Sequence, residues 1–320
     1  MGPGLSSAEP ARRRRRTIVL RCLPLGLLAV VLWREKPWAV ELSASAPWAV
    51  AAAVVLNFAV SLPLKAARWR IALPDPPPFR EALAATIEGL LANAAIGFGS
   101  GDLVRAARLR SGERELAVDY ACTLAERGAE VLALAILIFA TALVTDLGAL
   151  ALGLSGLTAA GYLALVGVGR LLVPRLARWP RVGRVAAAAL QASTPRRVAV
   201  ITALSLLGWT TEAAMLVMFQ GAFHLEPSFR TALVTLVGIN AAIAVPTLPG
   251  NFGTFEAGAT IALVMAGAPR DVAVSYALTY HLTHVVPVAI VGTALFLRSR
   301  SARYGSRRYK TTPAGTSSGR

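Results

Sequence analysis

The chain has 320 residues, of which 55% are hydrophobic and only 16% charged, and its net charge is +16. A soluble domain carries about 25% charged residues, so the composition excludes an ordinary soluble protein and indicates an all-α polytopic membrane protein. The excess of arginine is typical of cytoplasmic loops beside anionic lipid. Because no nucleic-acid-binding motif accompanies it, nucleic acid is not an expected partner.

The N-terminal part begins with a basic tail, residues 1–16, which is followed by a first predicted span at 17–33. A basic start before an apolar run is also typical of a signal peptide, but Arg21 interrupts the run and favours an uncleaved span. A second span is predicted at 47–64. It ends in basic and aromatic residues typical of a cytoplasmic membrane interface, namely Lys65, Arg68, Trp69 and Arg70.

The next apolar segment, 79–99, ends in a glycine-rich break that includes Gly99 and Gly101. Both of its flanks are rich in arginine. The same compartment on both sides predicts a re-entrant hairpin, with irregular backbone that must be covered by protein or water.

The rest of the chain predicts four more spans, at 117–143, 147–173, 198–223 and 272–297. A basic connector at 174–197 is expected to lie along the cytoplasmic lipid surface. Segments 231–249 and 253–267 predict a second hairpin, broken at Pro246, Pro249, Gly250 and Gly253. The last 23 residues, 298–320, predict a basic, disordered cytoplasmic tail.

These elements predict a single transmembrane domain, 17–297, with about six full spans and two broken re-entrant hairpins, or eight hydrophobic segments if the second hairpin spans. Both termini are expected in the cytoplasm of a cell-membrane protein. The sequence Asn93-Ala94-Ala95-Ile96 recurs as Asn240-Ala241-Ala242-Ile243. This echo suggests an inverted repeat, about 47–143 and 198–297. A chance match in an alanine- and valine-rich chain is the alternative.

Charged residues inside predicted spans are costly and mark candidate functional positions. Glu126 and Glu130 are four residues apart and share a helix face, with Arg127 beside them. They are candidates for an intramembrane polar site, and an ion pair near the interface is the alternative. Glu212 stands alone in its span, and Arg127 or His281 are conceivable partners.

Two further motifs follow the hairpin breaks. Gly101-Asp102-x-x-Arg105 offers donors suited to a phosphate, although Asp102 would also suit a helix N-cap. Pro249-Gly250-x-x-Gly253-x-x-Glu256 is its counterpart. His281 and His284 favour core hydrogen bonds over metal ligation. The sequence predicts no metal, no cofactor and no catalytic set, hence no enzyme.

The order of these motifs resembles the transmembrane region of lysylphosphatidylglycerol synthases, a flippase-like domain. The resemblance rests on Ala67-Arg68-Trp69-Arg70, Gly101-Asp102-x-x-Arg105, Glu126-Arg127 and the Pro246 to Glu256 motif. It implies lipid handling, such as moving a phospholipid or polyprenyl-linked lipid between leaflets, without aminoacyl transfer.

Membrane lipids are therefore the expected partners. The alternative function is that of a non-transporting membrane partner of a glycosyltransferase or lipid-modifying enzyme. For the site, we hypothesise that Arg105, Glu126 and Arg127 share one polar pocket with Glu256, because unpaired charges in hydrocarbon cost several kcal/mol.

Overall fold

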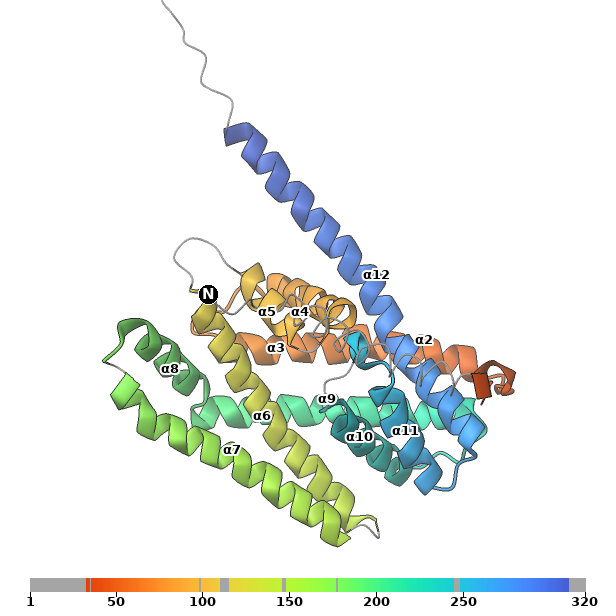
Figure 1. The fold of residues 1–320 in the computed structure, drawn as a ribbon. Coiled ribbons are helices and arrows are strands. Elements are labelled where there is room, and N and C mark those ends of the chain that lie inside the picture. The colour runs from red at the N-terminus through yellow and green to blue at the C-terminus, as the bar shows by residue number, and fades with distance from the viewer. Residues whose placement is uncertain are drawn as a thin grey trace, which may run out of the picture.

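The computed structural model describes residues 33–34, 36–97, 99–109, 115–145, 148–176, 178–244 and 248–310. Within these ranges the chain consists of helices joined by turns, and no strand occurs (Figure 1). The predicted tail at 1–16, nearly all of the predicted first span, Pro246 and residues 311–320 lie outside the described residues.

Four helices are long and apolar enough to cross a membrane: Ala46–Ala72, Leu152–Leu176, Pro195–Ala222 and Arg270–Ser299. They correspond to predicted spans of the sequence. In the structure they are formed by α2 (Ala46–Leu56) with α3 (Leu62–Ala72), by α7 (Gly148–Leu176), by α9 (Pro195–Ala222) and by α12 (Arg270–Lys310). A fifth long helix, α6 (Leu116–Leu143), is continuous, but its apolar sequence is interrupted by the charged residues Glu126, Arg127 and Glu130.

A five-residue π-helical segment, η2 (Asn57–Ser61), joins α2 to α3 without breaking the span. Pro63 lies two residues after its end. Proline lacks a backbone donor and its ring clashes with the carbonyl four residues earlier, and a π-helical turn is one way for a continuous helix to absorb such a defect. The first described span is therefore one helix with a local irregularity.

Contacts between helices define two ends of the bundle. At one end the Trp69 indole donates to the Thr123 hydroxyl over 2.9 Å, which joins α3 to α6. At the other end the Ser43 amide donates to the carbonyl of Ala222, the last residue of α9. The surface helix α8 (Pro180–Ala192) packs on α6 and α7, within the predicted basic connector.

The two hairpins enter the bundle from these opposite ends (Figure 1). The first consists of α4 (Phe79–Ala95) and α5 (Ser100–Arg108), and lies between the end of α3 and the start of α6. The second consists of α10 (Phe229–Ile243), the short η3 (Pro249–Asn251) and α11 (Thr254–Met265), and lies between the end of α9 and the start of α12.

Both hairpins close through a pair of glycines. A Cβ atom on Gly101 would collide with the carbonyl oxygen of Gly89 and with the side chain of Asn93. A Cβ atom on Gly258 would lie 2.5 Å from the carbonyl oxygen of Gly238 and 2.8 Å from the Ala242 Cβ. Each hairpin thus has the same contact, made by residues four apart on its first helix.

This geometry makes Asn93 equivalent to Ala242. The verbatim sequence echo instead aligns Asn93 with Asn240, so the echo and the packing differ in register by two residues. The hydrogen bonds agree with the packing: Asn93 accepts from the Gly101 amide at 2.7 Å, whereas Asn240 donates to the carbonyl of Leu236 in its own helix.

The breaks of the two hairpins contact each other. An added Cβ on Gly250 would lie 3.4 Å from the Ala94 carbonyl oxygen, and one on Gly97 would lie 3.9 Å from the Pro249 Cα. Helix α12 packs against both α4 and α11. It also continues into residues 298–310, which the sequence analysis expected to be disordered.

Candidate functional site

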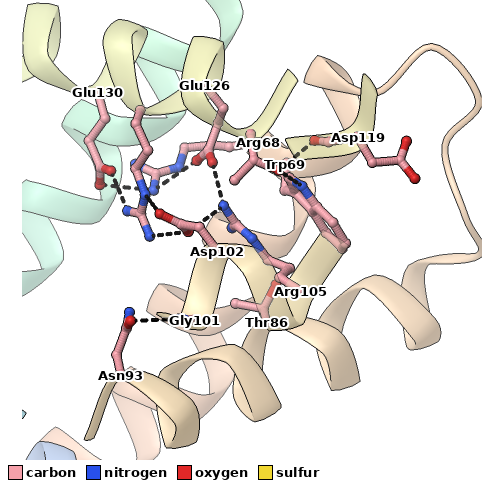
Figure 2. Close-up of polar contacts among 12 residues, drawn as sticks. Arg68, Trp69, Thr86, Asn93, Gly101, Asp102, Arg105, Asp119, Glu126 and Glu130 are labelled. Carbon is pink, nitrogen blue, oxygen red and sulfur yellow. Dashed lines mark hydrogen bonds and ion pairs between the residues drawn. The ribbon is translucent and has the colours of Figure 1, made fainter. Parts of the chain in front are cut away.

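Six charged side chains from three helices form one network beside the first hairpin (Figure 2). We call it the charge cluster, and it contains three arginines and three carboxylates: Arg68 of α3, Asp102 and Arg105 of α5, and Glu126, Arg127 and Glu130 of α6. Its formal charges balance. Such balance is what a cluster within a membrane-spanning bundle requires, because an unpaired charge there is expensive.

Glu126 lies at the centre of the charge cluster with a fully buried side chain. Its Oε1 is 3.2 Å from Arg68, and its Oε2 accepts from Arg105 at 3.0 Å. Arg68 also reaches Glu130 at 2.9 Å and donates to the Ser205 hydroxyl of α9 at 2.7 Å. Glu126 is thus a buried anion shared by two buried guanidinium groups.

Arg127 occupies the edge of the charge cluster. Its guanidinium donates to both carboxylate oxygens of Asp102, at 3.0 and 3.2 Å, and to Glu130 at 2.7 Å. Its side chain is 37% exposed, whereas the side chains of the other five members of the cluster are at most 15% exposed. Arg127 is therefore the member of the cluster best placed to contact an additional group.

The turn before α5 positions Asp102 and Arg105. The N-cap of α5 is Gly99, which has a positive φ of 81°, so Asp102 falls in the first turn rather than at the cap. The N-cap alternative is therefore wrong, and the Asp102 carboxylate instead contacts Arg105 and Arg127. The Arg105 guanidinium also lies over the Trp69 ring, 4.9 Å from its centroid.

Two residues assigned to the cytoplasmic interface are buried within the protein. Arg68 is 3% exposed and Trp69 is fully buried. They face inward because α3 packs between α6 and α9, which cover this side of the helix. Arg70 and Lys65 are partly exposed. Arg68 and Trp69 thus face the interior of the protein rather than lipid, and the sequence analysis missed Arg68 as a member of the charge cluster.

Glu256 belongs to a separate site in the second hairpin. Its carboxylate accepts from the Gly253 amide at 2.7 Å and lies 2.8 Å from His281 Nδ1. The His281 ring packs against Phe252 and Phe255, at centroid distances of 4.8 and 4.2 Å. The hypothesis of a pocket that joins Glu256 to Arg105 and Arg127 is therefore wrong, because His281 is the partner of Glu256.

Glu212 is held by two residues of α12. Tyr280 donates its hydroxyl to the carboxylate at 3.0 Å, and His284 Nε2 lies 3.3 Å away. Neither conceivable partner, Arg127 or His281, makes this contact. Tyr280 and His284 are four residues apart, so their spacing was a signal for a shared partner. The expected core hydrogen bonds of both histidines are confirmed.

Comparison of the sequence with known protein families gives a match. Residues 18–292 match the family described as lysylphosphatidylglycerol synthase TM region. The chain belongs to this family. No curated protein and no solved structure matches the chain.

The lysylphosphatidylglycerol synthase TM region family is related to lipid handling, and this member is a multi-pass membrane protein with an all-helical fold. Three of the motifs that carried the resemblance contribute side chains to the charge cluster, namely Ala67-Arg68-Trp69-Arg70, Gly101-Asp102-x-x-Arg105 and Glu126-Arg127. The described part of the chain contains no group of three His, Cys, Asp or Glu side chains that could hold a metal ion.

Proposed function

We propose that the protein binds the headgroup of a phospholipid or polyprenyl-linked lipid and moves it across the cell membrane. The observation that carries this proposal is the position of Arg127 at the edge of a buried, charge-balanced cluster. A guanidinium has five N–H donors and recognises phosphate in a fork geometry. Arg127 can therefore bind a lipid phosphate while Glu130 orients its side chain.

The balance of charges explains how such a site stays empty at low cost and still attracts an anion. Without lipid, each arginine of the charge cluster has a carboxylate partner. A phosphate that reaches Arg127 competes with Asp102, which is 14% exposed. Exchange of one anionic partner for another avoids leaving a bare charge in hydrocarbon.

The two hairpins supply a candidate mechanism for movement. They enter from opposite ends, close through equivalent glycine pairs and meet at Gly97 and Pro249. We interpret them as the broken elements of an inverted repeat, which is the symmetry expected of alternating access. The Glu256–His281 pair is the corresponding polar site of the second hairpin.

The orientation follows from the basic segments. Arg175, Arg178, Arg181 and Arg184 lie at the end of the bundle where the first hairpin begins and ends, and α12 runs toward the same end. Arginine-rich loops mark the cytoplasm. We therefore propose that this end of the bundle and both termini lie on the cytoplasmic side.

Reconstitution in liposomes tests the proposal. Vesicles containing a fluorescent phosphatidylglycerol are treated with an impermeant quencher, so that the fraction quenched reports movement between leaflets. We expect the wild type to exceed protein-free vesicles and Arg127→Gln to lose most of this difference. Arg181→Gln, which removes an exposed arginine of α8, is the matched control and retains movement. Folded wild type that moves no lipid would favour the alternative, a non-transporting partner of a lipid-modifying enzyme.

A further inference from the structure

A cavity of about 400 Å³ lies between the end of α3 and the start of α9, apart from the charge cluster. Two arginines line it, Arg70 of α3 and Arg197 of α9, which are 127 residues apart in the chain. The described lining contains no carboxylate, and its remaining walls are apolar, chiefly Ile71, Leu73, Pro74 and Pro76. The cavity thus combines two positive charges with hydrocarbon walls.

The periodicity of α3 separates this cavity from the charge cluster. Arg70 and Ile71 face the cavity, while Arg68 and Trp69 face the interior of the bundle. The last turn of α3 therefore carries arginines on two faces with different partners. Arg68 is satisfied by carboxylates, whereas Arg70 and Arg197 have no acidic partner in the described part of the chain.

Each cavity arginine is anchored by a backbone carbonyl. The Arg70 Nε donates to the carbonyl of Pro77 at 2.7 Å, and the Arg197 Nη1 donates to the carbonyl of Gln191 at 3.4 Å. A guanidinium has five donors, so most donors of both groups remain for a ligand. Two forks that converge on one cavity suit a phosphate, which accepts several charge-assisted hydrogen bonds.

The location of the cavity decides between a lipid and a soluble phosphate. The candidate span Ala46–Ala72 ends beside the cavity, and the candidate span Pro195–Ala222 begins beside it. The cavity therefore lies at the boundary between hydrocarbon and headgroups. A volume of this size falls within the 300–1,000 Å³ range typical of ligand sites and accommodates a headgroup. Apolar walls favour a ligand whose phosphate is attached to a glycerol and acyl chains.

We infer that this cavity is a binding site for the headgroup of an anionic phospholipid. Arg70 and Arg197 bind the phosphate, and the wall formed by Ile71, Leu73 and the prolines contacts the glycerol and the upper acyl chains. The site does not depend on the function proposed above, because it shares no residue with the charge cluster.

Native mass spectrometry of the full-length protein in detergent tests the inference. The probes are phosphatidylglycerol, phosphatidylcholine with the same acyl chains, and soluble glycerol phosphate. We expect tighter retention of phosphatidylglycerol than of phosphatidylcholine. Loss of two charge-assisted contacts in Arg70→Gln/Arg197→Gln weakens phosphatidylglycerol binding by about tenfold, and glycerol phosphate does not displace the lipid.

The control is Arg196→Gln, which removes the same charge from an exposed neighbour that does not line the cavity. It is expected to bind phosphatidylglycerol like the wild type. Arg197→Gln alone is the second variant if the Arg70 substitution prevents folding, since Arg197 makes only a long contact to backbone. Equal retention of phosphatidylglycerol and phosphatidylcholine would contradict the proposed site. So would an Arg196→Gln variant whose phosphatidylglycerol binding is weakened as much as that of the double variant. Displacement by glycerol phosphate would overturn the assignment to lipid.

Discussion

Gly101 of α5 lies against the carbonyl oxygen of Gly89 in α4 so closely that no Cβ atom fits between them. Gly238 and Gly258 repeat this relationship between α10 and α11. Both contacts place the two arms of a hairpin at backbone distance. They hold the Asp102–Arg105 turn beside α6.

We predict that Gly101→Ala and Gly258→Ala each destabilise the protein, by about 1–3 kcal/mol, because the added methyl group meets backbone atoms that cannot rotate away. The measurement is the free energy of unfolding in mixed detergent micelles. Gly153→Ala is the control, since nothing lies within 4 Å of its added Cβ in α7. It is expected to be neutral or to stabilise the helix by up to about 1 kcal/mol. Unchanged stability of Gly101→Ala would show that the hairpin is not packed in this way.

Gly253→Ala should also lower the stability of the protein, but for a different reason. No atom lies within 4 Å of an added Cβ at this position, yet its φ is +88°, which costs an L-residue about 1–2 kcal/mol. The backbone amide of the same residue donates to the Glu256 carboxylate. We expect reduced unfolding free energy together with a loss of lipid movement in liposomes. Gly267→Ala, with a similar φ of +94° in the loop before α12, controls for strain alone and should lower stability without this loss.

The topology is tested by cysteine accessibility. In a chain without native cysteines, Pro227→Cys and Ser43→Cys should react in intact cells with an impermeant reagent, because both lie at the Ala222 end of the bundle. Arg181→Cys in α8 should react only after the cells are opened. Reaction of all three in intact cells, or protection of the first two, would contradict the orientation and with it the inverted-repeat interpretation.

The sequence predicted those parts of the fold that depend on local chemistry. Long apolar runs predicted the spans because a bilayer demands them. The breaks at Gly99 and Gly253 were predicted because glycine adopts a positive φ at no steric cost. Glu126 and Arg127 were found because charges are rare within spans.

The interaction partners of several charged residues depend on tertiary packing, which the sequence did not predict. Arg68 resembled an interfacial arginine, and only the packing of α6 and α9 around α3 makes it a buried partner of Glu126 and Glu130. His281 became the partner of Glu256 because α11 and α12 pack together. The repeated Asn-Ala-Ala-Ile sequence was offset from the true packing equivalence because glycine contacts, rather than asparagines, set the hairpin register.

The structure also changes which charges should be energetically coupled. Arg127 contacts Asp102 and Glu130, whereas Glu256 pairs with His281. We predict that Arg127→Leu and Asp102→Leu are non-additive, with a coupling of about 1 kcal/mol in unfolding free energy, because removal of one partner leaves the other unpaired. Arg127→Leu and Glu256→Leu should be additive to within about 0.5 kcal/mol, as expected for sites without shared partners.

A third variant tests the centre of the charge cluster. Glu126→Leu removes the carboxylate that Arg68 and Arg105 share. Glu130 and Asp102 remain as their partners, but three arginines then face two carboxylates in a buried site, and loss of one partner from a buried pair costs about 3–5 kcal/mol. We therefore expect it to be the most destabilising single change of the six cluster residues. Arg105→Leu in the same chain should recover part of the loss, since it restores the balance between arginines and carboxylates in the charge cluster. The measurement is again unfolding free energy in mixed micelles. The contradicting outcome is additivity: the double variant would be less stable than Glu126→Leu by the same amount that Arg105→Leu alone destabilises the wild type. That result would show that these two residues do not form one charge-balanced site.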